Sequence, residues 1–231
     1  MPATGNNIAS EISIQVSLGG FSFVRSGPDG QAERSPWLGA ERVFNLPELQ
    51  QRYSRVDFSL LTPKVALVPE PFFAPEGARS ALEQVCALDP EDKVEWVKIP
   101  AQQAVLIYSN SIGESLSRVL SQTVLDLDGN PAPVLPEMYW LLEQLPLIQE
   151  YNKIVLSWQD GWLHLVIAQG KTLQLANVFQ APDFTTAQYF LFLALKRLQL
   201  NPEVSTVCVR TPLDMESEMS LYRYFKAVVQ L

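Results

Sequence analysis

Two aspartates separated by one residue form the pattern in this chain with the most chemical potential. Asp126 and Asp128 follow an apolar stretch in the segment VLDLDGN, residues 124–130. An aspartate carboxylate can act as a nucleophile or as an acid/base, so two of them this close could do either. Only about 100 residues follow, and no later strand is followed by paired acids that would hold a metal. Asp, Gly, Asn and Pro are also turn residues. We therefore expect a solvated turn at this place.

One histidine and two cysteines restrict every other catalytic arrangement. His164 lies in the strand-like segment WLHLVIAQ without a cysteine or acid at ligand spacing, so we expect a structural histidine. Cys86 and Cys208 lie among apolar residues and are expected to be packing thiols. A single histidine excludes multi-histidine metal sites. We expect no catalytic residue, no metal and no cofactor.

Two predicted β-hairpins are the elements that would position any site. The first has alternating apolar and polar residues up to Ser17, then a turn with Gly19 and Gly20. The second joins two apolar strands through Asp160 and Gly161, and Asp-Gly between strands is a strong hairpin signal. The predicted strands are Glu11–Ser17, Phe21–Arg25, Lys153–Gln159 and Trp162–Gln169.

Each hairpin is followed by a third strand, a helix, a strand and a helix. In the second half, these elements are predicted at residues 172–179, 185–200, 205–210 and 216–229. A cluster of breaker residues from Asp126 to Pro136 separates the halves, and a helix interrupted at Pro146 is predicted at residues 137–150. The repeated order predicts a degenerate internal duplication, with one half at residues 1–130 and the other at 131–231.

Composition excludes several classes of function. The chain has 231 residues, 47% hydrophobic, which is enough for a substantial core. Seventeen basic against 25 acidic residues give a net charge of −8, which disfavours nucleic acid and anionic membranes as partners. No apolar run reaches the length of a membrane span, and the first residues do not form a secretory signal. Two distant cysteines favour a reducing, cytoplasmic location.

The duplicated order of strands and helices resembles the actin-like ATPase fold, in which each half is a ribonuclease-H-like domain and nucleotide lies between the halves. Three segments resemble, more narrowly, a bacterial family known as a domain of unknown function with an actin-like fold: Ser13–Val24, Leu61–Phe73 and Lys153–Gly170. The resemblance implies an α/β fold with a mixed sheet flanked by helices in each half. A complete second half would continue past its final helix with a strand and a helix, so a trimmed second half is left open.

The resemblance also implies where a nucleotide would bind. Actin-like ATPases carry an acid at the end of the first strand of each half, and glycine turns that approach phosphate. The matching acid positions hold Ser17 and Ser157 here. The glycines of the motif are present in the first half as Gly19 and Gly20, and Asp160 and Gly161 match its later part in the second half. Trp158, in contrast, places an indole where phosphate would need room. A serine cannot offset the desolvation of Mg²⁺, so these loops are expected to be vestigial.

The expected function is that of a non-catalytic cytoplasmic binding or scaffolding protein, a pseudo-ATPase whose partner is another protein. Tryptophan and tyrosine are enriched in interaction hot spots. Trp37 in its Gly/Pro-rich loop and the Tyr139–Trp140 pair are the candidate partner surface, and a homodimer is left open. The alternative is a nucleotide-binding or phosphate-transferring enzyme of the same fold.

Overall fold

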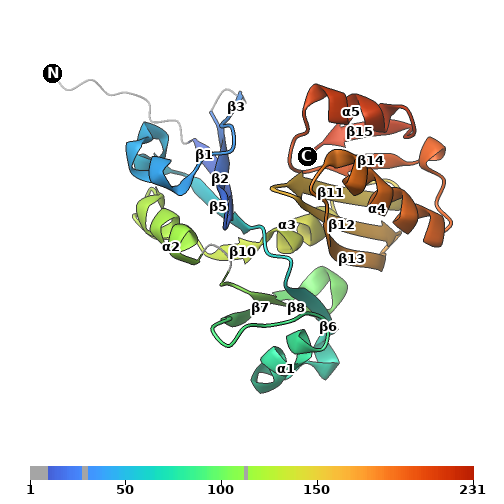
Figure 1. Ribbon diagram of the computed structural model, residues 1–231, viewed down its shortest axis with the longest axis horizontal. Helices are drawn as coiled ribbons and strands as arrows, with labels where there is room; N and C mark the ends of the chain where they lie inside the picture. The colour runs from blue at the N-terminus through green and yellow to red at the C-terminus, as the bar shows by residue number, and fades with distance from the viewer. Residues whose placement is uncertain (1–9, 28–30, 112–113) are drawn as a thin grey trace. The chain divides into compact units, whose positions relative to one another are not determined.

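The computed structural model of the chain describes residues 10–27, 31–111 and 114–231 (Figure 1). They divide into two compact units. The first comprises Met1–Leu60 and Ile112–Leu135, and the second comprises Leu61–Ser111 and Pro136–Leu231. The units are therefore interleaved along the chain, whereas the predicted halves 1–130 and 131–231 are sequential. The sequential division into two ribonuclease-H-like halves stays a prediction.

The first unit contains a five-stranded sheet of order β10-β5-β1-β2-β3. The hairpin of β1 (Glu11–Ser17) and β2 (Gly20–Ser26) is antiparallel, and β3 (Ala32–Arg34) continues it. On the other side, β1 pairs in parallel with β5 (Arg55–Leu60), which neighbours β10 (Val134–Pro136).

The core of the first unit forms because Ile12, Ile14 and Val16 alternate along β1 and face one side of the sheet. The helix α2 (Glu114–Thr123) contributes Leu116 and Leu120 to the same core. Two 3-10 helices (Ala40–Asn45 and Pro47–Gln50) and a short pair of β4 (Arg52–Tyr53) with β9 (Leu125–Asp126) complete the unit.

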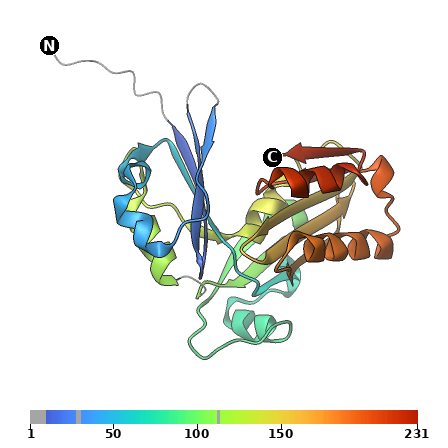
Figure 2. The same ribbon diagram turned by 45° about the horizontal axis from the view of Figure 1, so that its top comes forward.

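The second unit contains a five-stranded sheet of order β13-β12-β11-β14-β15 (Figure 2). The antiparallel strands β11 (Asn152–Gln159), β12 (Trp162–Gln169) and β13 (Thr172–Gln180) match the second predicted hairpin and its third strand. The strand β14 (Thr206–Val209) is parallel to β11, and β15 (Ala227–Gln230) is parallel to β14. The order of strands in the two sheets is thus the same, in agreement with the repeat predicted from the sequence.

The central strands of the second sheet carry apolar residues in nearly every position. Each face of the sheet therefore packs against a core of its own. Ile154 and Leu156 face the core formed with α4 (Phe184–Arg197) and α5 (Met215–Tyr222). Val155 and Val166 face the opposite core, which includes Met138 and other side chains of α3 (Glu137–Gln144).

Residues 61–111 add a smaller sheet to the second unit, of order β6-β8-β7. Its strands are β6 (Val65–Pro69), β7 (Val94–Ile99) and β8 (Ala104–Ser109), and α1 (Ala78–Glu83) packs on it through Leu82. Short 3-10 helices at Glu70–Phe72, Pro75–Gly77, Pro100–Gln102 and Pro202–Val204 fill its connections and one later loop. Ile99 and Leu106 also join the core under α3.

Two predicted helices are shorter than expected. The helix α3 ends at Gln144, before Pro146, which cannot continue a helix. The last predicted helix, residues 216–229, was wrong in its second half. The helix α5 ends at Tyr222, and Ala227–Gln230 forms β15. Because β15 follows α5, the second sheet has the further strand whose presence the sequence left open.

Candidate functional site

The turn between β1 and β2 contains the first of the two serines at the expected acid positions. Ser17 is the last residue of β1, and its side chain is almost fully buried. Its hydroxyl oxygen accepts a hydrogen bond of 3.0 Å from the backbone N–H of Gly19. A neutral hydroxyl stabilises this turn but contributes no negative charge for a cation.

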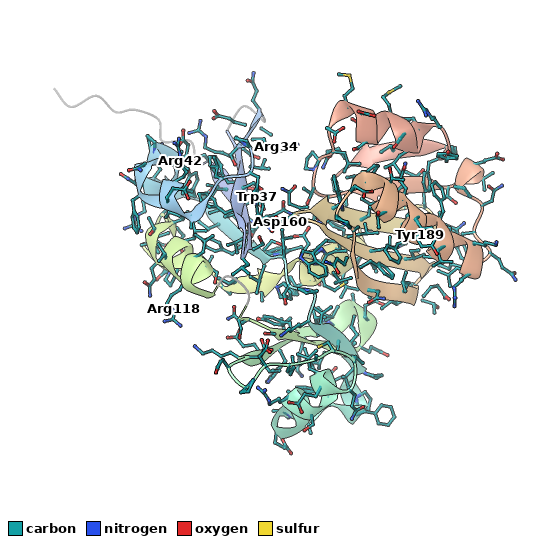
Figure 3. The ribbon with its side chains drawn as sticks, in the orientation of Figure 1. Arg34, Trp37, Arg42, Arg118, Asp160 and Tyr189 are labelled. Atoms are coloured by element: carbon teal, nitrogen blue, oxygen red, sulfur yellow. The ribbon has the colours of Figure 1, made fainter. Side chains whose placement is uncertain are left out.

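A larger residue at position 20 would clash with the backbone of a neighbouring segment. The φ of Gly20 is +147°, and a Cβ atom there would lie 2.1 Å from the carbonyl oxygen of Leu38. The N–H of Phe21 donates to Leu38 O, and the N–H of Leu38 donates to Phe21 O, at 2.9 and 2.7 Å. Trp37 lies at the same place, with Nε1 3.1 Å from the position of that Cβ (Figure 3). The residues 37–38 therefore occupy the space beside this glycine.

The second serine is also sequestered. Ser157 in β11 is fully buried, and its Oγ lies 2.5 Å from Oγ1 of Thr211. The following turn has Asp160 and Gly161 at φ values of +50° and +76°, as in the type I′ turn that Asp-Gly favours. Asp160 is exposed at the tip of this turn, two residues beyond Trp158. No group of three or more His, Cys, Asp or Glu suitable for a metal occurs among the described residues.

Both the N–H and the ring of the Trp158 indole have partners within the second unit. The Nε1–H of Trp158 donates to the carbonyl of Ala181 at 2.8 Å, and its ring meets Phe184 at 5.2 Å between centroids. The indole is therefore fixed beside the start of α4.

A buried polar cluster lies under α3. Glu137, the first residue of α3, is fully buried and forms an ion pair of 2.6 Å with Arg210, which follows β14. The guanidinium of Arg210 also lies over the Trp140 ring, 5.7 Å from its centroid. A buried carboxylate held by a nearly buried guanidinium fixes the end of β14 to the start of α3.

His164 belongs to the same face of the sheet, opposite Ser157 in the β11–β12 register. Its ring is fully buried, and no side chain of the described residues forms a hydrogen bond with either nitrogen. Burial lowers the pKa of His164 to about 4, although the nearby Glu137 carboxylate opposes that shift. The imidazole is neutral at physiological pH and is enclosed in the core, in agreement with a structural histidine.

The other reactive residues predicted to be structural have structural surroundings. Burial raises the pKa of the Cys208 thiol to about 11, so it is protonated at neutral pH. Asp126 accepts a hydrogen bond of 2.7 Å from the N–H of Asn130, and Gly129 has φ +86°. The Asp126–Asn130 segment is therefore a turn closed by its own carboxylate, as expected from its composition.

The candidate partner residues are each partly buried. Trp37 lies beside Gly20, Tyr139 packs on the core under α3, and Trp140 lies beneath Arg210. Tyr139 and Trp140 also meet edge to face at 5.2 Å. Other aromatic side chains are exposed over more than 60% of their surface, at positions that the sequence analysis did not single out: Phe44, Phe72, Tyr151 and Tyr189.

Sequence reasoning also missed the pair of Glu137 and Arg210. The two residues are 73 positions apart, and each resembles an ordinary surface charge in the sequence. One signal was present. Glu137 follows the proline-rich boundary directly and begins an apolar helix, a place where a carboxylate can interact with the helix N-terminus.

Residues 40–228 match the model of a family described as "Protein of unknown function (DUF3822)". No curated protein matches the chain. Within the described residues, no helix is long and apolar enough to span a bilayer.

Several solved structures are similar in fold. One is a protein of Bacteroides thetaiotaomicron described as having an actin-like ATPase fold and unknown function. It has a TM-score of 0.66 and 16% identity over 100% of this chain and 94% of that chain. A second is the cytoplasmic domain of EpsL, an inner membrane component of the type II secretion system of Vibrio cholerae. It has a TM-score of 0.51 and 14% identity over 89% and 83% of the two chains. A third is the PilM–PilN type IV pilus biogenesis complex. It has a TM-score of 0.52 and 14% identity over 96% of this chain and 88% of that chain.

Proposed function

The chain belongs to the DUF3822 family of proteins of unknown function and has the actin-like ATPase fold, and on this premise we propose that it is a non-catalytic protein that binds another protein. In this proposal it acts in the cytoplasm as a scaffold or adaptor and does not hydrolyse ATP. Its two cysteines are both free, which is consistent with a reducing compartment.

One observation carries the proposal: Ser157 occupies the position expected for an acid, and its hydroxyl is buried against Thr211. Binding of Mg²⁺ with a nucleotide needs carboxylates that offset the charge and the desolvation of the ion. The equivalent residue of the first hairpin, Ser17, is bonded to its own turn. The glycine that follows, Gly20, accommodates the carbonyl of Leu38.

The class of partner is inferred from charge and from fold. A net charge of −8 disfavours nucleic acid and anionic lipid, which leaves protein as the favoured macromolecule. Two structures of similar fold come from a secretion-system component and from a pilus biogenesis complex. At 14% identity they support an adaptor role by analogy of fold only.

The first test is nucleotide binding. We expect no thermal shift and no phosphate release above background when the purified protein is mixed with MgATP. Magnesium-dependent hydrolysis that is lost in Asp160→Ala would contradict the proposal and support the enzymatic alternative.

The second test is partner binding. Proteins captured from the native cell by the wild type are identified, purified and mixed again with the wild type, with Trp37→Ala and with Tyr189→Ala as an aromatic control. We expect reconstituted binding that Trp37→Ala weakens and Tyr189→Ala leaves unchanged. A wild type that remains a monomer and reconstitutes with no captured protein contradicts the proposal.

A further inference from the structure

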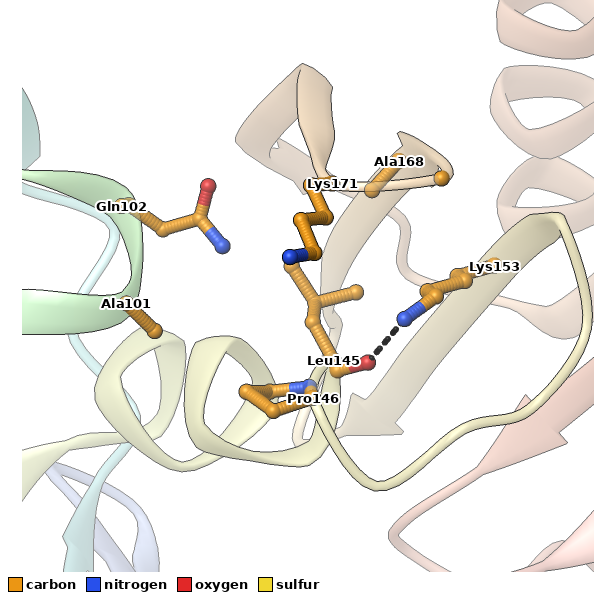
Figure 4. A pocket seen from close by; sticks show the side chains of 8 residues that line it. Ala101, Gln102, Leu145, Pro146, Lys153, Ala168 and Lys171 are labelled. Carbon is orange, nitrogen blue, oxygen red and sulfur yellow. Dashed lines mark hydrogen bonds between the residues drawn. The ribbon is translucent and has the colours of Figure 1, made fainter.

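A hollow of about 320 Å³ lies within the second unit, at the end of the β12–β13 turn (Figure 4). Four segments form it, and one of them is the start of β11 with Lys153. The turn supplies Lys171, the 3-10 helix at Pro100–Gln102 supplies Gln102, and the residues that end α3 supply Leu145 and Pro146. A second hollow of about 580 Å³ shares Gln102 and Lys171 and continues along β13 to Leu173. Both volumes fall within the range of small-molecule sites.

The hollow is positively charged in a chain that is strongly acidic. Lys153 and Lys171 line it, and no Asp or Glu is among the residues that line either hollow in the described part of the chain. The remaining lining is mostly apolar. In a protein of net charge −8, two lysines with no carboxylate among the residues that line the hollow concentrate positive potential at one place.

The two lysines differ in how they are held. Lys153 Nζ donates a hydrogen bond of 2.7 Å to the carbonyl of Leu145, the residue that caps the C-terminus of α3. This contact fixes the ammonium in place and is favourable with the helix dipole. Lys171 forms no ion pair or side-chain hydrogen bond among the described residues, and Figure 4 shows its side chain directed between Gln102 and Leu145.

We propose that this hollow binds a small organic anion, a carboxylate or phosphate ester with an apolar body. The anionic group lies against Lys171 and the amide of Gln102, with Lys153 as a second, fixed charge. The apolar body lies against Leu145 and Pro146. Lysine recognises an anion as a point charge, whereas bidentate recognition would use arginine. None of the residues that line it belongs to the Ser17–Gly20 turn or the Asp160-Gly161 turn, so this inference does not depend on the proposed function.

The test uses backbone amide chemical shifts of the whole protein at low salt. The probes are phenyl phosphate, benzoate, inorganic phosphate and the neutral benzyl alcohol. We expect the two aromatic anions to shift the amides of Gln102, Gly170 and Lys171 saturably. We expect inorganic phosphate to bind more weakly, because it lacks the apolar body, and benzyl alcohol to bind more weakly, because it lacks the charge.

The decisive variant is Lys171→Gln, at an exposed turn position where the fold should be retained. We expect it to weaken binding of phenyl phosphate by about tenfold, roughly the loss of one charge-assisted contact. Lys196→Gln, an exposed lysine near the end of α4, is the matched control and should bind as the wild type does. Equal affinity in Lys171→Gln and the wild type, or no saturable shift at these amides with either aromatic anion, overturns the proposal. So does benzyl alcohol binding as tightly as phenyl phosphate.

Discussion

The hydroxyl oxygens of Ser157 and Thr211 lie 2.5 Å apart in the interior of the second unit, at the end of β11. Neither side chain has access to solvent sufficient to bind a hydrated cation. The hydroxyl of Ser157 is therefore committed to a buried hydrogen bond, and the contribution of that bond can be tested by mutation.

The Ser157–Thr211 bond should contribute to stability. Ser157→Ala and Thr211→Val should each lower the free energy of unfolding by about 1–2 kcal/mol, because each leaves a buried hydroxyl without that partner. The double variant should cost less than the sum of the two. Denaturant unfolding measures all three. Additive losses would show that the two hydroxyls do not interact.

Replacing Ser157 with aspartate should not create an ATPase. The carboxylate would be buried beside Thr211 and opposite His164, whose imidazole is neutral near pH 7, and a buried charge without a charged partner is strongly destabilising. We expect a loss of more than about 2 kcal/mol in unfolding free energy and no phosphate release with MgATP. A stable Ser157→Asp protein that hydrolyses ATP would show instead that only the acid is missing.

Gly20→Ala tests why the glycine is needed. A Cβ would lie 2.1 Å from Leu38 O, in a backbone conformation that other residues rarely adopt, so we expect a loss of about 2–4 kcal/mol without any ligand present. Gly77→Ala is the control, because nothing lies within 4 Å of its Cβ position. It should be neutral or slightly stabilising. If Gly20→Ala is as stable as Gly77→Ala, the close approach of Leu38 is not what requires the glycine.

His164 should make the protein less stable in mild acid. The pKa of His164 is about 4 in the folded protein, below its usual value of 6.5, so the unfolded chain binds the extra proton. The free energy of unfolding therefore has its full value above about pH 6.5 and decreases as the pH falls toward 4, by up to about 3 kcal/mol. Thermal unfolding between these pH values measures it. In His164→Leu this part of the pH dependence should disappear, and an unchanged pH profile would contradict the role given to the imidazole.

Asp92 should stabilise the β6–β8–β7 sheet. Its buried carboxylate accepts hydrogen bonds from Lys64 Nζ and Ser109 Oγ, both at 2.6 Å, and from the N–H of Asp89 at 2.7 Å. Burial opposes ionisation, but these bonds hold the pKa of Asp92 at about 2. Asp92→Ala should cost about 3 kcal/mol near neutral pH, since Lys64 loses its buried partner. The stabilisation by Asp92 should decline as the pH falls from about 4 toward 2.

The matched control for this prediction is Asp89→Ala. Asp89 also contacts Lys64, at 3.1 Å, but its side chain is 81% exposed. An exposed ion pair contributes about 0–1 kcal/mol. Equal losses in Asp89→Ala and Asp92→Ala, measured by denaturant unfolding, would show that burial does not distinguish the two carboxylates.

Local sequence signals predicted the parts of the fold that depend on local chemistry. Asp160-Gly161 specified its turn, because both residues must adopt positive φ. The last strand was missed because Glu216–Tyr222 is a good helical segment and the short run Ala227–Val229 offers little period to separate strand from helix. Its identity as a strand depends on pairing with β14, a contact that is not local.

The candidate sites were predictable only in part. Ser17 and Ser157 could be located through a resemblance, but their hydrogen bonds with the N–H of Gly19 and the hydroxyl of Thr211 are known only from the fold. The hollow beside Lys171 brings together segments near residues 101, 145, 153 and 170. No spacing in the sequence indicates that these segments meet.

The interleaving of the two units has a consequence for how the chain folds as it is synthesised. The first unit ends at Leu60 but is completed only by residues 112–135, which carry α2 and the outer strand β10. While the ribosome makes residues 61–111, the growing sheet lacks Leu116, Leu120 and Val124 of its core. Those intervening residues can form only the small core around Leu82 by themselves, because Ile99 and Leu106 on the other face of their sheet pack with Met138 and later residues. Neither unit can therefore close early, and the nascent chain must keep apolar surface exposed until well past its midpoint.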